Sequence, residues 1–104
     1  MSNLTREAIR AIRTKNSISL AKTIGGRHRI ARTGTPHTII QIGDMTYSIC
    51  FFTERVIDKR YFDAGYRIFW PWPTNGSVQK QRTYLSRSGV VQFINRLKLK
   101  ALSR

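Results

Sequence analysis

The segment Thr38–Phe52 constrains the fold more than any other part of the sequence, because apolar and polar residues alternate along it on both sides of a short turn. Gly43 and Asp44 interrupt the alternation. A period of two is typical of strands, and a Gly-Asp pair between two such runs fits a two-residue hairpin turn. The pattern therefore predicts two antiparallel strands with one apolar face, which another element must cover because an isolated hairpin is marginal in water.

Two further strands are expected after this hairpin. Residues 66–70 alternate in the same way and predict a third strand, which must end at the proline-rich residues 71–73 because proline cannot donate to a ladder. Asn75 and Gly76 then form a hairpin-type turn. This turn leads into residues 78–85, which predict a weakly apolar and therefore exposed fourth strand.

Helical spacing of apolar residues is present at both ends of the chain. Residues 3–14 predict a short helix, for which Ser2, Asn3 or Thr5 is available as N-cap. Ser17 can cap a second short helix, which ends at Gly25 and Gly26. Residues 89–104 predict the last helix, with Ser86 or Ser88 as its cap. A basic stripe at i, i+4 and i+7 runs along the first helix and consists of Arg6, Arg10 and Arg13.

Two connecting segments differ in charge. Residues 25–37 are rich in glycine and arginine and predict a mobile basic loop or an irregular edge strand, without the ending of a phosphate-binding P-loop. Residues 53–66 hold three of the five acidic residues and predict a salt-bridged surface turn or short helix.

These elements predict an α+β fold: a small antiparallel sheet of three or four strands, short basic N-terminal helices and a C-terminal amphipathic helix. A chain of 104 residues has room for one domain, in which residues 1–36 are expected to form a loosely attached helical arm. Cys50 is the only cysteine and lies in a predicted strand, which indicates a reducing compartment. Without a signal core or a long apolar run, we expect a cytoplasmic protein that does not enter a membrane.

The charge balance is the strongest indication of function. Lys and Arg number 19 against five Asp and Glu, so the net charge is +14. Residues 1–37 carry eight of these cations and residues 81–104 carry six, whereas the middle of the chain is nearly balanced. An anionic partner would relieve this self-repulsion, and the candidates are nucleic acid, an acidic protein or an anionic membrane. The membrane is disfavoured, because the first predicted helix has no Trp or Phe anchor.

Catalysis and metal binding have little support in the sequence. His28, His37 and a buried Cys50 do not supply the three or four convergent ligands of a metal site. A strand thiol among apolar residues is typical of a core cysteine rather than a nucleophile. We therefore expect a protein that is not an enzyme, with no catalytic residue, no cofactor, no metal and no small-molecule substrate.

The candidate binding residues are cations and two tryptophans. Trp70 and Trp72 stand in an aromatic and proline cluster of the kind that is enriched at binding hot spots, although Trp70 could instead close the core over the hairpin. Bonds from an aromatic residue to proline favour recognition by a prolyl isomerase at Pro71 or Pro73. The candidate cations are Arg6, Arg10, Arg13, Arg27, Arg29, Arg32, Arg82, Arg87, Arg96, Lys98 and Lys100.

Two functions fit these residues. In the first, the chain is a nucleic-acid-binding module whose basic segments 6–32 and 82–104 hold phosphates, while Trp72, Tyr66 or Tyr84 stacks on bases. In the second, it is a protein-binding inhibitor or adaptor that docks on an acidic protein, for example at the nucleic-acid channel of a DNA-processing enzyme. The charge pattern fits both, because such an enzyme and DNA both offer anionic surfaces.

The basic start NLTREAIRAIR and the basic end FINRLKLKALSR enclose a small domain without an enzyme motif. In size and charge this chain resembles accessory proteins encoded in phage early regions, among them the anti-RecBCD type, which bind a host nuclease-helicase. The resemblance implies a host–virus interaction in which an acidic host protein of nucleic-acid metabolism is the partner, DNA recombination is modulated, and the host cytoplasm is the location. It assigns no individual site residue.

Overall fold

The chain forms a five-stranded antiparallel sheet, a separate two-stranded sheet and two helices, within residues 5–74, 76 and 78–103 that the computed structural model describes. The strand order of the large sheet is β1-β2-β3-β6-β7. The α+β class is confirmed, and the sheet is larger than expected. The bounds are α1 Arg6–Ile24, β1 Arg27–Ile30, β2 Pro36–Ile42, β3 Met45–Phe52, β4 Arg55–Ile57, β5 Arg60–Phe62, β6 Gly65–Trp70, β7 Lys80–Tyr84 and α2 Arg87–Leu102.

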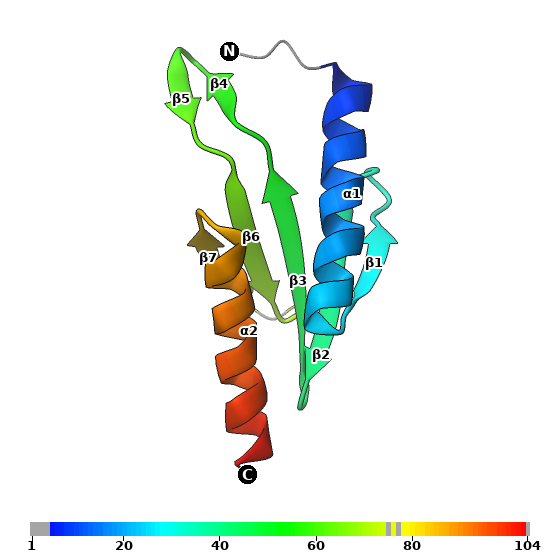
Figure 1. Cartoon of the computed structure of the whole chain (residues 1–104), viewed down its shortest axis with the longest axis vertical. Coiled ribbons are helices and arrows are strands. Elements are labelled where there is room, and N and C mark those ends of the chain that lie inside the picture. Colours follow the sequence, from blue (N-terminus) through cyan, green and yellow to red (C-terminus); the bar gives the residue numbers. More distant parts are fainter. Residues whose placement is uncertain (1–4, 75, 77, 104) are drawn as a thin grey trace.

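Both helices pack on the same face of the large sheet. α1 lies over β1, β2 and β3, whereas α2 contacts β2, β6 and β7, and the two helices also touch each other. Figure 1 shows them side by side in front of the strands. The opposite face of the sheet therefore has neither of the two described helices over it.

The predicted pair of short N-terminal helices is wrong, because α1 is one continuous helix of 19 residues. Ser17 does not cap a second helix. Its buried hydroxyl lies 3.1 Å from the Thr38 hydroxyl and 2.8 Å from Nδ1 of His28, so the polar residue inside the helix is satisfied by β1 and β2. The helix ends where Gly25 takes the left-handed conformation with a φ of 79°, as its sequence predicts.

The N-terminal region is part of the core rather than a loose arm. Leu20 and Ile24 of α1 are each 1% exposed and belong to the central apolar cluster. Thr5 is the N-cap of α1 and accepts a hydrogen bond from the Ala8 amide. The other two cap candidates, Ser2 and Asn3, lie outside the described residues.

The strands after α1 follow the predicted order. β2 and β3 form the expected hairpin around Gly43, which has a φ of 60°. β6 is the third expected strand, β7 is the exposed fourth, and β1 confirms the edge-strand alternative for the basic segment. Asn75 of the predicted turn lies outside the described residues. The bonds from Trp70 to Pro71 and from Trp72 to Pro73 are both cis.

The core lies between the two helices and one face of the sheet. The register places Ile40, Ile49 and Ile68 on the helix side, where they meet side chains of both helices. Tyr47 and Trp70 pack against Phe93 of α2 with ring centroids 6.4 and 5.8 Å away. The buried members are Leu20, Ile24, Ile40, Tyr47, Ile49, Tyr66, Ile68, Val90, Phe93 and Ile94.

The acidic segment after β3 forms a β-hairpin, β4–β5, and not the expected salt-bridged turn or helix. Its turn residues Asp58 and Lys59 have φ values of 49° and 63°, which fit a two-residue hairpin turn. Figure 1 shows the hairpin projecting beyond the end of the large sheet. Glu54 accepts a 2.6 Å hydrogen bond from the Tyr61 hydroxyl, and this bond raises the pKa of Tyr61 to about 12.

We expect the substitution Ile94→Ala to lower the free energy of unfolding by about 2–5 kcal/mol, because Ile94 is fully buried and its loss leaves a cavity. Leu99→Ala on the same helix is the matched control, since Leu99 is 64% exposed. Its effect should stay within about 0.5 kcal/mol in chemical denaturation. Equal losses for the two variants would contradict the placement of α2.

Candidate nucleic-acid interface

The face of the large sheet opposite the two helices is formed by every second residue of each strand, namely those that alternate with the core residues. One row of paired residues crosses all five strands from Arg27 through Ile39, Ser48 and Phe69 to Gln81. None of the described residues on this face is acidic. We define the helix-free face by Arg27, Arg29, His37, Ile39, Gln41, Thr46, Ser48, Cys50, Phe52, Arg67, Phe69, Gln81 and Thr83.

Trp72 lies against this face because the chain folds back after β6. The Trp72 amide donates a 3.0 Å hydrogen bond to the Thr46 carbonyl, and the indole meets the His37 ring edge-on at 5.4 Å. The Arg29 guanidinium lies 5.7 Å from the indole centroid. Burial and then the charge of Arg29 lower the pKa of His37, which favours the neutral form of this imidazole.

A surface pocket of about 420 Å³ opens beside Trp72. Arg27, Gln41 and Thr46 are among the residues that line it. Its volume is within the range of about 300–1,000 Å³ that is common for small-ligand sites. Gly26 is needed at its edge, because a Cβ there would come within 2.6 Å of the Ile39 carbonyl oxygen.

Three guanidinium groups surround the ring of Phe52, the last residue of β3. Those of Arg13, Arg55 and Arg67 lie 4.9, 5.3 and 5.1 Å from its centroid. Such contacts are worth about 0.5–1 kcal/mol each at exposed sites, and they hold the three cations together. No described carboxylate forms an ion pair with them, so their charge remains available to an anion.

Arg13 reaches this ring from α1. Its Nε donates a 2.7 Å hydrogen bond to the Phe51 carbonyl. Phe51 lies beyond the part of β3 that pairs with β2, which ends at the pair Thr38 and Ile49. Its Nη2 is buried and has no hydrogen-bond partner. Burial is the main cause that lowers the pKa of Arg13, and the neighbouring charge of Arg55 acts in the same direction.

The predicted site residues fall into three groups. Arg27, Arg29 and Trp72 lie together at the helix-free face. Arg6, Arg10 and Arg13 line a separate pocket beside α1, and exposed Arg32 lies in the loop before β2. The remaining candidates, Trp70, Arg82, Arg87, Arg96, Lys98 and Lys100, lie on the helix side of the sheet or on α2.

Several candidates on the helix side have structural contacts. Trp70 packs in the core, and the Arg82 guanidinium lies 5.6 Å from the Phe93 centroid. Arg87 donates a 2.6 Å hydrogen bond to the Thr23 hydroxyl. Tyr66 is buried in the core and Tyr84 packs on Phe93, so neither expected tyrosine presents a free ring on the helix-free face.

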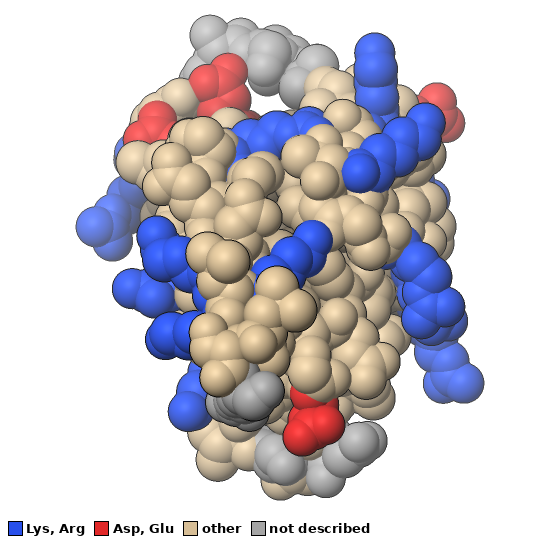
Figure 2. Space-filling model, turned by 60° about the horizontal axis from the view of Figure 1, so that its bottom comes forward, with Lys and Arg blue, Asp and Glu red and all other residues tan. Residues whose placement is uncertain are grey.

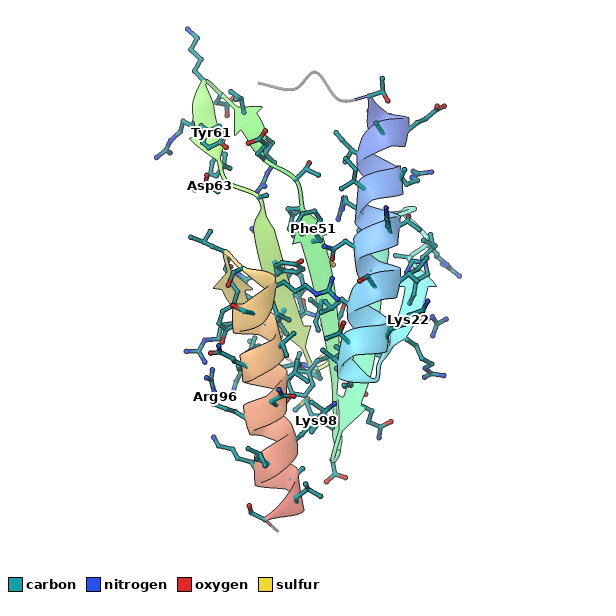
Figure 3. All side chains as sticks on the ribbon, viewed as in Figure 1. Lys22, Phe51, Tyr61, Asp63, Arg96 and Lys98 are labelled. Carbon is teal, nitrogen blue, oxygen red and sulfur yellow. The ribbon has the colours of Figure 1, made fainter. Side chains whose placement is uncertain are left out.

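Lys98 joins the two helices. Its ammonium group donates to the Ile24 carbonyl at the C-terminus of α1, and Figure 3 shows the side chain directed from α2 toward that end. Arg96 points the opposite way in the same view. The cations of the two chain ends therefore do not form one surface, and Figure 2 shows Lys and Arg around the rim of a largely uncharged area.

Sequence reasoning missed Phe52, Arg55, Arg67 and Phe69 as site residues. Three of them were visible in the alternation, because Phe52, Arg67 and Phe69 occupy the out-of-phase positions of predicted strands. A residue out of phase with the core residues must lie on the other face of the sheet. Arg55 carries no such signal, since its position depends on the unexpected β4–β5 hairpin.

The substitution Lys98→Met should lower the free energy of unfolding by about 1 kcal/mol, because the C-terminal carbonyl of α1 loses a charged donor. Lys100→Met, two residues along the same helix, removes the same charge from an exposed position and should have little effect. Thermal or urea unfolding of both variants measures the difference. A larger loss for the Lys100 variant would contradict the bridging role of Lys98.

No helix in the described part of the chain is long and apolar enough to cross a membrane. No group of three or more His, Cys, Asp or Glu among the described residues could hold a metal ion, and burial raises the pKa of the Cys50 thiol. No family model, curated protein or solved structure matches this chain.

Proposed function

We propose that the protein binds single-stranded nucleic acid on the helix-free face of its sheet and catalyses no reaction. The observation that carries the proposal is the arrangement of arginines among aromatic rings on a face without a described carboxylate. Arg27, Arg29 and Arg67 lie there with Phe69 and Trp72. Basic surfaces with interleaved aromatic rings are typical of single-strand binding proteins.

The two kinds of side chain would have separate tasks. Guanidinium groups bind phosphates in any sequence, and aromatic rings stack on unpaired bases for about 1–3 kcal/mol per base. Phe69 and Trp72 are both half-buried, so part of each ring is accessible. Bases inside a duplex are stacked on each other, which favours a single strand as the ligand.

Salt dependence and a charge-removing variant test this proposal together. If about five phosphates are bound, the logarithm of the affinity for a deoxythymidine oligonucleotide should fall against the logarithm of the salt concentration with a slope of about −3.5. Arg67→Gln should weaken binding and reduce that slope by about 0.7, as fluorescence anisotropy would measure.

Lys22→Gln is the matched control, because Lys22 is exposed on α1 and is not part of the helix-free face; Figure 3 shows it beside the helix. It removes the same charge and should leave the affinity close to that of the unmodified protein. An affinity that barely changes with salt, or equal losses for the two variants, would overturn the proposal.

A second candidate function is an inhibitor or modulator that docks on a host DNA-processing enzyme. The β4–β5 hairpin favours it, because Val56, Ile57 and Tyr61 are 44%, 51% and 55% exposed although they are large and apolar. The backbone of the hairpin lies against no other helix or strand of the described chain, although the Arg55 side chain reaches the ring of Phe52 in β3. Exposed apolar side chains gathered on a projecting element are typical of a protein interface.

The substitution Ile57→Ser tests this second function with the purified RecBCD nuclease-helicase. If the hairpin docks on that enzyme, the unmodified protein should inhibit its nuclease activity and the variant should inhibit about tenfold more weakly, or about 1.4 kcal/mol. Leu99→Ser is the control with the same chemical change at an exposed position of α2. Undiminished inhibition by the Ile57 variant, or none by the unmodified protein, would argue against docking through the hairpin.

A further inference from the structure

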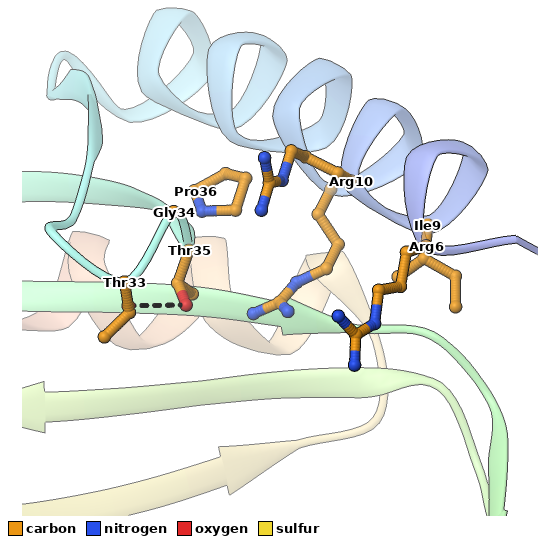
Figure 4. Close-up of a pocket in the computed structure, with 8 residues that line it drawn as sticks. Arg6, Ile9, Arg10, Thr33, Gly34, Thr35 and Pro36 are labelled. Carbon is orange, nitrogen blue, oxygen red and sulfur yellow. Dashed lines mark hydrogen bonds between the residues drawn. The ribbon is translucent and has the colours of Figure 1, made fainter.

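A second basic site lies between the first half of α1 and the loop that joins β1 to β2. It is a pocket of about 170 Å³, and Figure 4 shows Arg6 and Arg10 on the helix across from the loop residues Thr33 and Thr35. The lining contains no acidic residue. Its members are Arg6, Ile9, Arg10, Arg13, Thr33, Gly34, Thr35 and Pro36.

Helix periodicity brings the three arginines to one side of α1. Residues spaced by three and four positions are neighbours on a helix surface, so Arg6, Arg10 and Arg13 converge on the same opening. Each guanidinium has five N–H donors in a planar fork that matches the oxygen atoms of a phosphate. No described carboxylate forms an ion pair with any of the three, and the one hydrogen bond that their side chains make to a described residue runs from Arg13 to the Phe51 carbonyl.

The loop forms the opposite wall and is fixed by its own hydrogen bonds. The Gly34 amide donates a 2.8 Å hydrogen bond to the Ala31 carbonyl, and the Thr33 and Thr35 hydroxyls lie 3.1 Å apart. Gly34 has a φ of 86°, and a Cβ on it would come within 2.7 Å of Nη2 of Arg10. The glycine therefore allows the Arg10 guanidinium to lie directly over the loop.

One donor at the pocket has no acceptor. Nη2 of Arg13 is buried and without a hydrogen-bond partner, although Nε of the same guanidinium donates to the Phe51 carbonyl. An unsatisfied buried donor costs about 1–3 kcal/mol, or more when it is charged. This guanidinium therefore keeps its charge without a described carboxylate partner at the wall of the pocket, where it adds to the positive potential of Arg6 and Arg10.

We propose that this pocket binds the terminal phosphate monoester of a nucleic-acid strand, an inference that rests on the proposed function. A monoester carries nearly two negative charges near neutral pH, whereas each phosphodiester inside a strand carries one. Three arginines with two threonine hydroxyls match the larger charge, and the Thr33 and Thr35 hydroxyls add donors beside Arg10.

The position of the pocket also favours a strand end. Arg13 lines the pocket and at the same time contacts Phe52, which is the last residue of β3 at the end of the helix-free face. A strand that lies along that face would therefore reach the pocket where the sheet ends. Its terminal phosphate would meet Arg6, Arg10 and Arg13, while the internal phosphates meet Arg67 and Arg29.

Oligonucleotides of one sequence that carry a 5′-phosphate, a 3′-phosphate or only hydroxyl ends test the inference. A phosphate at one of the two ends should raise the affinity about tenfold, and the end that gives the gain identifies the polarity of binding. Inorganic phosphate in excess should remove the gain without releasing the strand. Arg10→Gln should abolish the gain but still bind the hydroxyl-ended strand.

Lys15→Gln is the matched control, since Lys15 is exposed on the same helix and does not line this pocket. It should keep the full gain, and circular dichroism should show that both variants are folded. Equal affinity of the unmodified protein for all three oligonucleotides overturns the inference and leaves the proposed function standing. Failure to bind any of the three overturns the proposed function itself.

Discussion

The packing of both helices on one face of a single sheet is the interaction on which the rest of the structure depends. Apolar side chains of α1, α2 and three central strands form one cluster, with Ile68 and Ile94 fully buried in it. Because most apolar residues of the strands are used there, the alternate residues lie on a face that no helix of the described residues covers. Ile39 and Cys50 are buried on that face, and the rest of its chemistry is set by arginines, aromatic rings and polar groups.

A chain with a net charge of +14 must keep its cations in place without enough acids to pair them. Aromatic rings take over part of this task. The Phe52 ring gathers three guanidinium groups, and the Trp72 ring faces Arg29. These contacts position the cations without neutralising them, whereas a carboxylate in the same place would cancel the charge. The positive potential of the surface is therefore preserved for a ligand.

The sequence predicts the central sheet well, because its signals are local. Alternation and Gly43 define the β2–β3 hairpin, and Ser86 caps α2 as expected. The break in α1 was predicted wrongly, because a serine at position 17 is typical of a helix cap. In the fold its hydroxyl is instead satisfied by His28 on β1 and Thr38 on β2, which the local sequence does not reveal. The site was harder to predict, because convergence of Arg13, Arg55 and Arg67 on one ring depends on the β4–β5 hairpin and on strand register rather than on spacing along the chain.

Arg55 connects the two proposed binding surfaces. As the first residue of β4, it lies 5.3 Å from the ring of Phe52 on the sheet and 5.3 Å from the ring of Phe62 on the hairpin. Figure 1 places the hairpin at the same end of the molecule as the first half of α1, which lines the pocket formed by Arg6, Arg10 and Arg13. A protein held by the hairpin would therefore lie beside a strand end held by the pocket. The proposed strand-end site and the proposed docking surface would therefore be neighbours, and one partner could contact both.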